Sequence, residues 1–181
     1  MGLKDLFAQN LLLRWLSGHG RSPDLAVSMA GVRLGERVVQ FGLGDGRLLV
    51  ALAAKVGYTG RACGVDDDPS AVARASRAAE RAGVLVELEQ GPAGRAALDA
   101  ASFDLAVLLA SGTSLAVTPQ LLGDALRLLR PGGRCLVVMP GGAATEATPP
   151  LVDGLRQAGF KASRELARRE GLSFLEATKA S

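Results

Sequence analysis

Aromatic residues make up only 4% of this 181-residue sequence, although hydrophobic residues as a whole make up 48%. A core of that composition must be built mainly from Ala, Val and Leu, and such small side chains let helices lie close on a sheet. The length suits one domain and leaves little for a second. The sequence therefore predicts a single globular unit.

Long apolar runs and cysteine pairs are also missing. No stretch approaches the ~20 apolar residues of a membrane span, and the leucine-rich residues 11–16 include Arg14 and lack a signal-peptide cleavage site. The two cysteines, Cys63 and Cys135, lie far apart in apolar runs without CxxC spacing. We therefore expect buried free thiols in a cytoplasmic protein with no transmembrane segment.

Charge of one sign is not concentrated anywhere along the chain. The formal charge is +3, the pI is about 9.2, and no five consecutive residues are Lys or Arg. Charge therefore does not indicate a nucleic-acid partner, and none is expected. No cluster of His and carboxylates has metal-ligand spacing, so no metal site is expected either. The oligomeric state stays open.

The sequence does have a regular alternation of strand-like and helix-like segments from residue 36 onward. Predicted strands cover residues 38–41, 61–66, 84–90, 103–110 and 135–139, and two more within 160–179 meet near Gly171. Predicted helices cover residues 46–56, 68–83 and 118–130, and a last one begins at Thr148, after a loop at 141–144. Such alternation predicts a doubly wound α/β fold with a mostly parallel sheet.

Charged side chains mark two of these strands as edges of the sheet. Residues 86–89 alternate between apolar and acidic, and residues 163–169 are heavily charged. Charge on a strand blocks further pairing, so the third and the second-to-last strand are expected at the two edges.

Three glycines, Gly42, Gly44 and Gly46, follow the first strand and open the first helix. Glycine lets the backbone turn tightly and approach a ligand without a Cβ clash, and the helix amides face whatever binds. Asp66 lies 20 residues further on, at the end of the second strand, where an acid can bind both hydroxyls of a ribose. We interpret the loop as a nucleotide site; a tight turn without a ligand is the alternative.

The spacing of the loop separates cofactor classes. A dinucleotide site requires Gly or Ala three residues after Gly44, and this sequence has Arg47, which disfavours NAD and FAD. The G-x-x-x-x-G-K-[ST] phosphate loop is also absent, which disfavours ATP and GTP.

Four stretches resemble class I S-adenosylmethionine (SAM)-dependent methyltransferases, and the likeness covers roughly residues 34–179. The stretches are Leu34–Gly46, Gly64–Pro69, Phe103–Val107 and Leu129–Gly133, and the chain ending at Ala158–Phe160 and Phe174–Ala177 is also similar. The resemblance implies a Rossmann-like, seven-stranded sheet in the order 3-2-1-4-5-7-6, with only the last strand antiparallel. Strands two and five are then not neighbours, so a Cys63–Cys135 disulfide is not expected.

The resemblance also implies SAM as the cofactor and a set of residues that bind it. The set is Gln40, Gly42, Leu43, Gly44, Gly46, Asp66, Asp67, Gly91, Pro92, Ala110 and Ser111. Two positions depart from the family pattern, which usually has an acid in place of Gln40 and often an Asp in place of Pro92. We expect a helical cap or lid at residues 1–33, with one helix around residues 3–17 and a second that begins at Ser22. A SAM-binding domain is expected at residues 34–181.

The function that the resemblance implies is methyl transfer from SAM to a small-molecule or protein acceptor. The Asp/Asn-Pro-Pro-aromatic motif of many nucleobase and amide N-methyltransferases is missing at residues 109–113. His19 is the only histidine and a candidate general base, although a solvated loop histidine is the more ordinary interpretation. The departures at Gln40 and Pro92 keep an alternative open, a non-catalytic methyltransferase-like binding or partner domain.

Overall fold

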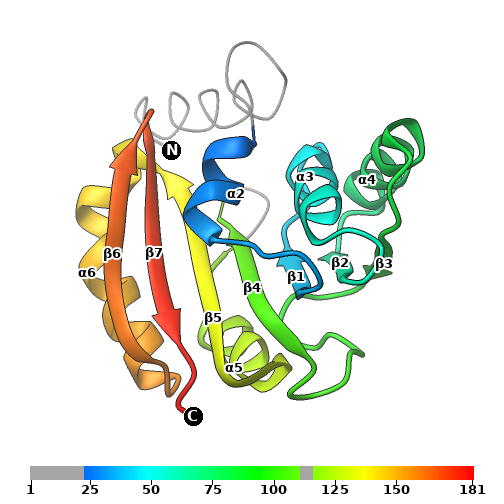
Figure 1. The fold of residues 1–181 in the computed structure, drawn as a ribbon. Helices are drawn as coiled ribbons and strands as arrows, with labels where there is room; N and C mark the ends of the chain where they lie inside the picture. The colour runs from blue at the N-terminus through cyan, green and yellow to red at the C-terminus, as the bar shows by residue number, and fades with distance from the viewer. Residues whose placement is uncertain (1–22, 111–115) are drawn as a thin grey trace.

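A computed structural model describes residues 23–110 and 116–181 of the chain, which form one mixed sheet between two layers of helices (Figure 1). The strands are β1 (Arg37–Phe41), β2 (Arg61–Asp66), β3 (Glu87–Gln90), β4 (Phe103–Leu109), β5 (Leu129–Pro140), β6 (Lys161–Arg169) and β7 (Leu172–Thr178). The helices are α2 (Asp24–Ala30), α3 (Arg47–Val56), α4 (Pro69–Ala82), α5 (Pro119–Leu128) and α6 (Gly141–Gln157).

The seven strands lie in the order β3-β2-β1-β4-β5-β7-β6, which confirms the predicted topology. The five strands from β3 to β5 in this order are parallel to one another, and β7 is antiparallel to both β5 and β6. β3 and β6 are the edge strands, as their charges predict. The order reverses between β1 and β4, and the carboxyl ends of these strands are where a ligand binds in sheets of this type.

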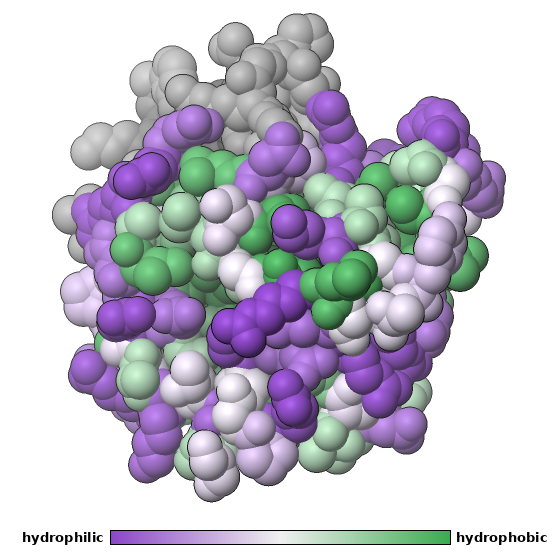
Figure 2. Space-filling view, viewed as in Figure 1, coloured by the Kyte–Doolittle hydropathy of each residue, from purple (hydrophilic) through white to green (hydrophobic). Residues whose placement is uncertain are grey.

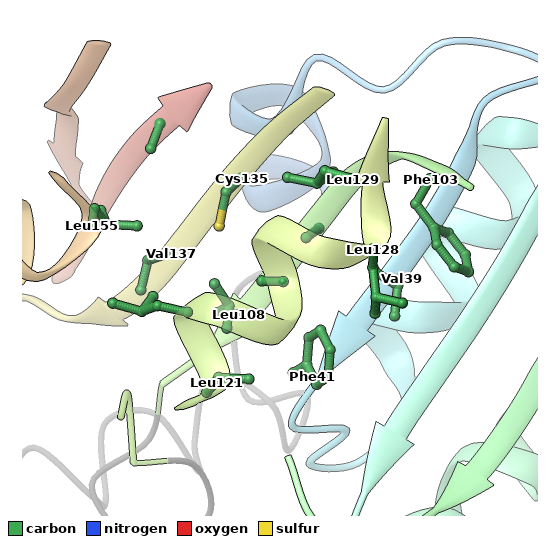
Figure 3. Packing of buried hydrophobic residues seen from close by; sticks show 14 of the residues in the cluster. Val39, Phe41, Phe103, Leu108, Leu121, Leu128, Leu129, Cys135, Val137 and Leu155 are labelled. Carbon is green, nitrogen blue, oxygen red and sulfur yellow. The ribbon is translucent and has the colours of Figure 1, made fainter. Parts of the chain in front are cut away.

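The hydrophobic core lies in two clusters, one on each face of the sheet. Side chains of α2, α3 and α4 pack on one face, and side chains of α5 and α6 pack on the other. Figure 3 shows the second cluster, where Leu121 and Leu128 of α5 lie beside Phe41 of β1 and Leu108 of β4. β1 and β4 are buried over nearly all their length, as strands covered on both faces should be.

The helices that flank the site begin at predicted caps. The side chain of Asp68 accepts a hydrogen bond from the Ser70 N–H at 2.8 Å, and Pro69 is the first residue of α4. The Thr118 hydroxyl accepts from the Leu121 N–H at 3.2 Å at the start of α5. Each cap satisfies an amide that the helix itself leaves without a partner.

Three element boundaries differ clearly from the prediction, and the smallest of these differences is that β3 begins at Glu87 rather than at Val84. α6 begins at Gly141, so the prediction of a loop at residues 141–144 is wrong. The helix contains Pro149 and Pro150. The prolines suggested a helix start because proline favours the first turn, but alanines before them are strong helix formers and extend the helix backward.

β5 begins at Leu129, whereas the sequence predicts a start at Cys135. Its register with β4 shifts between the Phe103 and Leu105 pairings, so residues 130–133 form an irregularity inside the strand. Gly132 has φ +74° there, and the backbone of Lys179 donates to the Gly133 carbonyl at 2.8 Å. The turn predicted at Pro131 is therefore absorbed into the sheet.

α2 packs against α3, with Ala26 and Ala30 buried in the same cluster as the side chains of α3. The first predicted helix, around residues 3–17, lies outside the described residues, and the role of residues 1–33 as a cap stays a prediction. Among the helices of residues 23–110 and 116–181, none is long and apolar enough to cross a membrane.

The two cysteines are buried as free thiols in strands that are not neighbours, because β1 and β4 separate β2 from β5. Burial raises the pKa of the Cys63 thiol to about 12 and raises the pKa of the Cys135 thiol as well. We predict that neither thiol reacts with an alkylating reagent at pH 8 in the native protein, because the thiolate is the reactive form. Both should react in denaturant, as mass spectrometry would show; rapid labelling of the native protein would contradict this burial.

Candidate functional site

The predicted glycine loop joins β1 to α3 at the carboxyl end of the sheet. Gly42, Gly44 and Gly46 have φ values of +77°, +57° and +83°, a backbone conformation that costs other L-residues about 1–2 kcal/mol. The Gly42 N–H donates to the Val65 carbonyl at 3.1 Å and so joins the loop to β2. The three glycines are therefore required by the shape of the loop itself.

Asp66 ends β2 and holds the loop in place. Its side chain is only 4% exposed. Its Oδ2 accepts from the Leu43 N–H at 2.7 Å, and its Oδ1 accepts from the Asp68 N–H at 3.0 Å. A carboxylate has about four lone-pair sites, so this carboxylate can still accept two further hydrogen bonds from a ligand.

Gln40 lies beneath the loop on β1 and is completely buried. Its Nε2 donates to the Gly42 carbonyl at 2.7 Å, whereas its Oε1 finds no donor within the part of the chain that the structure describes. A buried acceptor without a donor costs about 1–3 kcal/mol. Such an orphaned atom needs an explanation, and a ligand donor next to the loop would supply one.

A cavity of about 180 Å³ lies beside the loop. It is lined by Gly42, Val65, Asp66, Asp67, Pro92, Ala93, Ala116 and Thr118. Four of these residues belong to the predicted cofactor-binding set, so the fold brings the ends of β1, β2 and β3 to one place. The Gly91 N–H donates to the Asp66 carbonyl at 3.0 Å, which fixes the segment that carries Pro92.

Ala116 and Thr118 are lining residues that the sequence did not reveal. They come from the segment before α5, and their only local signal is the cap that Thr118 provides for that helix. Nothing in a capping threonine distinguishes a cavity wall from an ordinary helix start. Only the placement of α5 beside the carboxyl end of β4 brings them to the site.

The remaining predicted residues support the loop or lie elsewhere. The side chain of Leu43 is buried in the core, and its backbone N–H is the group that meets Asp66. The Gly44 carbonyl accepts from Arg74 Nε at 3.0 Å. The backbone N–H of Ala110 donates to the Val138 carbonyl at 2.9 Å. Ser111, a predicted cofactor-binding residue, and His19, the candidate base, both lie outside the described residues.

Gly46 is the point where α3 meets α4. A Cβ at this position would lie 2.5 Å from the Cα of Ala75 on α4, closer than atoms of this kind can approach. The missing side chain therefore lets the two helices pack, and it sets the distance between α4 and the loop.

Asp45 is a further acid of the loop that the sequence did not single out. Burial raises the pKa of its carboxyl above the ordinary value, although a hydrogen bond from the Arg47 N–H opposes the shift. The carboxylate accepts that bond at 3.0 Å at the start of α3. Among the side chains that the structure describes, no three of His, Cys, Asp or Glu are placed to hold a metal ion.

The Gln40→Glu variant tests the hydrogen bond beneath the loop. The introduced carboxyl would face the Gly42 carbonyl without water, so its pKa in the folded protein should lie above the value of about 4.3 in the unfolded chain. The folded state then binds more protons than the unfolded state, and stability falls as the pH rises above that value.

We expect the free energy of unfolding of Gln40→Glu, relative to the parent protein, to fall by a further ~1–3 kcal/mol between pH 5 and pH 8. Urea titrations of both proteins at the two pH values measure this difference. A difference that does not change with pH would show that the Gln40 amide is not held against Gly42.

Comparisons with known proteins show the family of the chain. Residues 38–133 match the family model described as "Methyltransferase domain". The chain is 33% identical to the ribosomal protein L11 methyltransferase of Thermus thermophilus over 157 residues, which cover 85% of this chain and 58% of that protein. The chain thus spans somewhat more than half the length of this curated relative.

Solved structures share the fold at low sequence identity. A SAM-dependent methyltransferase from Aquifex aeolicus superposes with a TM-score of 0.75 at 18% identity, covering 86% of this chain and 88% of that one. The YcgJ protein from Bacillus subtilis superposes with a TM-score of 0.72 at 15% identity, covering 88% and 98%. Because the family match covers more than half of the sequence, the chain belongs to the methyltransferase-domain family, and its sheet has the class I, Rossmann-like topology.

Proposed function

We propose that this protein binds SAM on the glycine loop and transfers its methyl group to a small molecule or to a protein side chain. The observation that carries the proposal is the position of Asp66. Its buried carboxylate holds the loop, faces the cavity and retains acceptor capacity for two hydroxyl groups. An acid at the end of the second strand, opposite a glycine loop, is the arrangement that binds the ribose of a nucleotide.

The described residues suit the other parts of SAM as well. Gly42 and Gly44 would leave room for the methionine portion because they carry no Cβ. The unpartnered Oε1 of Gln40 would accept from its ammonium group. Pro92 and Ala93 would form an apolar wall against the adenine. With proline at this position, only main-chain groups nearby could contact the adenine amino group.

The chemistry that SAM supplies when bound is a methyl group on a positively charged sulfur. The protein's own part is to fix the loop through Asp66 and Gln40, to keep water out and to align the acceptor. Alignment alone can supply much of the rate acceleration in a displacement of this kind, so an acid–base residue is optional. The sequence offers His19 as a candidate base for an acceptor that must lose a proton, beside the more ordinary interpretation of a solvated loop histidine.

Two observations support finer parts of the proposal. The similarity to a methyltransferase of ribosomal protein L11 supports a protein side chain as the first acceptor class to test. The two buried free thiols support a cytoplasmic location, because reducing compartments keep such thiols unpaired.

Product formation tests the proposal. The purified protein is incubated with SAM and with separate protein and small-molecule fractions of a cell extract, and the demethylated product is measured by mass spectrometry. We expect product in one fraction and much less of it with Asp66→Ala at the same SAM concentration. A protein that binds SAM but releases no product in any fraction would contradict methyl transfer and favour the alternative, a non-catalytic binding domain.

A further inference from the structure

A groove between α3 and α4 gathers positive charge away from the cavity beside Asp66. The two helices lie side by side on one face of the sheet (Figure 1). A hollow of about 720 Å³ between them is lined by Arg47, Arg74, Arg77 and Arg81, which we call the arginine groove. Among the lining residues that the structure describes, Asp45 is the one acid. Hydrophilic residues project around α4 at the upper right of Figure 2.

The spacing along α4 explains why the guanidinium groups share one side. Arg74, Arg77 and Arg81 are three and four residues apart, and residues at these intervals lie on the same face of a helix. Arg47 is the first residue of α3 and faces them across the hollow. The contact of Gly46 with Ala75 holds the two helices at this distance.

The four arginines of the groove carry more charge than the two acids beside them, Asp45 and Asp68, can neutralise. Several arginines elsewhere are paired, for example Arg127 with Asp124 at 2.7 Å and Arg134 with Glu36 at 3.0 Å. In the groove, Arg74 contacts Asp68 at 3.5 Å. The other three arginines are exposed, and no side-chain hydrogen bond or ion pair of theirs is found among the described residues. Clustered unpaired charge of one sign attracts a partner of the opposite sign.

The groove continues into a second hollow that carries an exposed aromatic ring. This hollow has a volume of about 600 Å³ and shares Ala54 and Ala82 with the arginine groove. Tyr58, which is 87% exposed, and Leu85, which is 78% exposed, lie along it. A partner that follows the α3–α4 surface would therefore meet several positive charges and an aromatic face.

We propose that the arginine groove docks single-stranded nucleic acid, with phosphates on Arg47, Arg77 and Arg81 and a base stacked on Tyr58. Proteins that bind single strands combine a positively charged groove along the backbone with aromatic rings on which bases stack. An acidic peptide would match the charges but would leave the exposed ring without a role. The inference concerns docking and does not depend on the methyl acceptor.

This proposal departs from the expectation drawn from the sequence, in which no basic run indicated nucleic acid. The arginines of the groove come from two helices, and Arg47 is 27 residues from Arg74 in the chain. Helix packing assembles a charge cluster that a search for consecutive basic residues does not detect.

Fluorescence anisotropy with a labelled 12-nucleotide RNA of mixed sequence tests the proposal without SAM. We expect a dissociation constant in the range of ~10⁻⁴–10⁻⁶ M, and the logarithm of affinity should fall with the logarithm of salt concentration with a slope of about −2 for three phosphate contacts. The double variant Arg77→Ala/Arg81→Ala should make that slope shallower by about 1.4. The matched control, Arg164→Ala/Arg169→Ala on β6, should leave the slope unchanged.

Tyr58 provides the second measurement. Stacking of one base predicts that Tyr58→Leu weakens RNA binding about five-fold or more, whereas Tyr58→Phe, which keeps the ring, retains it. Circular dichroism confirms that each variant is folded. Three outcomes would each overturn the proposal. They are an equal loss of RNA affinity in the α4 and β6 double variants, no effect of Tyr58→Leu, and tighter binding of a labelled 12-residue polyglutamate than of the RNA.

Discussion

The Gly46→Ala variant should lose about 2–5 kcal/mol of unfolding free energy, the sum of a strained backbone and a close contact. Gly46 has φ +83°, and the added Cβ would lie 2.5 Å from the Cα of Ala75. Because the contacted atom belongs to the backbone of α4, no side-chain rotation relieves it. The helix as a whole must move, and the loop that begins α3 must move with it.

Gly83→Ala is the matched control for this effect. Gly83 ends α4 at φ +66°, and an added Cβ there would meet nothing within 4 Å. Only the backbone cost of about 1–2 kcal/mol remains. Urea unfolding of the three proteins measures both losses, and equal losses would mean that the contact between Gly46 and α4 does not hold the helices together.

The Asp66→Ala variant should weaken the binding of SAM by about 10–100-fold or more, because hydrogen bonds to a charged group contribute ~1.5–3 kcal/mol each. The same substitution removes the acceptor of the Leu43 N–H, so some of the loss comes through a loosened loop. Calorimetric titration of the folded variant measures the change in affinity.

The Asp68→Ala variant separates the loss of a contact with SAM from a loss of local stability around the loop. Asp68 is the neighbouring acid that caps α4 through Ser70, and it does not line the cavity. Its loss should cost about 0.5–2 kcal/mol of stability, as cap removal usually does, with little change in SAM affinity. If Asp68→Ala weakened SAM binding as much as Asp66→Ala, the effect would belong to local stability and Asp66 would lose its role as a ligand.

Parts of the site that depend on local chain geometry could be predicted from the sequence. Glycines between a strand and a helix predict a tight loop, and an acid that ends the next strand must lie beside it in a parallel sheet. Gly42, Asp66, Asp67 and Pro92 do line one cavity. The sheet order and both edge strands followed from the family resemblance and from strand charge.

Parts that depend on packing between distant segments could not be predicted. Ala116 reaches the cavity only because α5 lies against the carboxyl end of β4, and Arg77 meets Arg47 only because Gly46 lets two helices approach. The hydrogen bonds of Gln40 and Leu43 could not be predicted either. The Gln40 amide donates to the Gly42 carbonyl, and the Leu43 backbone N–H donates to the Asp66 carboxylate. A sequence pattern shows each residue without its partner.

We propose that the glycine loop with Asp66 is a functional SAM site. Calorimetric titration of the purified protein with SAM and with its demethylated product tests this claim. The geometry of the loop predicts binding of at least one of them with a micromolar dissociation constant, and a clear weakening in Asp66→Ala. Absence of binding up to millimolar concentration, by a protein shown to be folded, would contradict the claim.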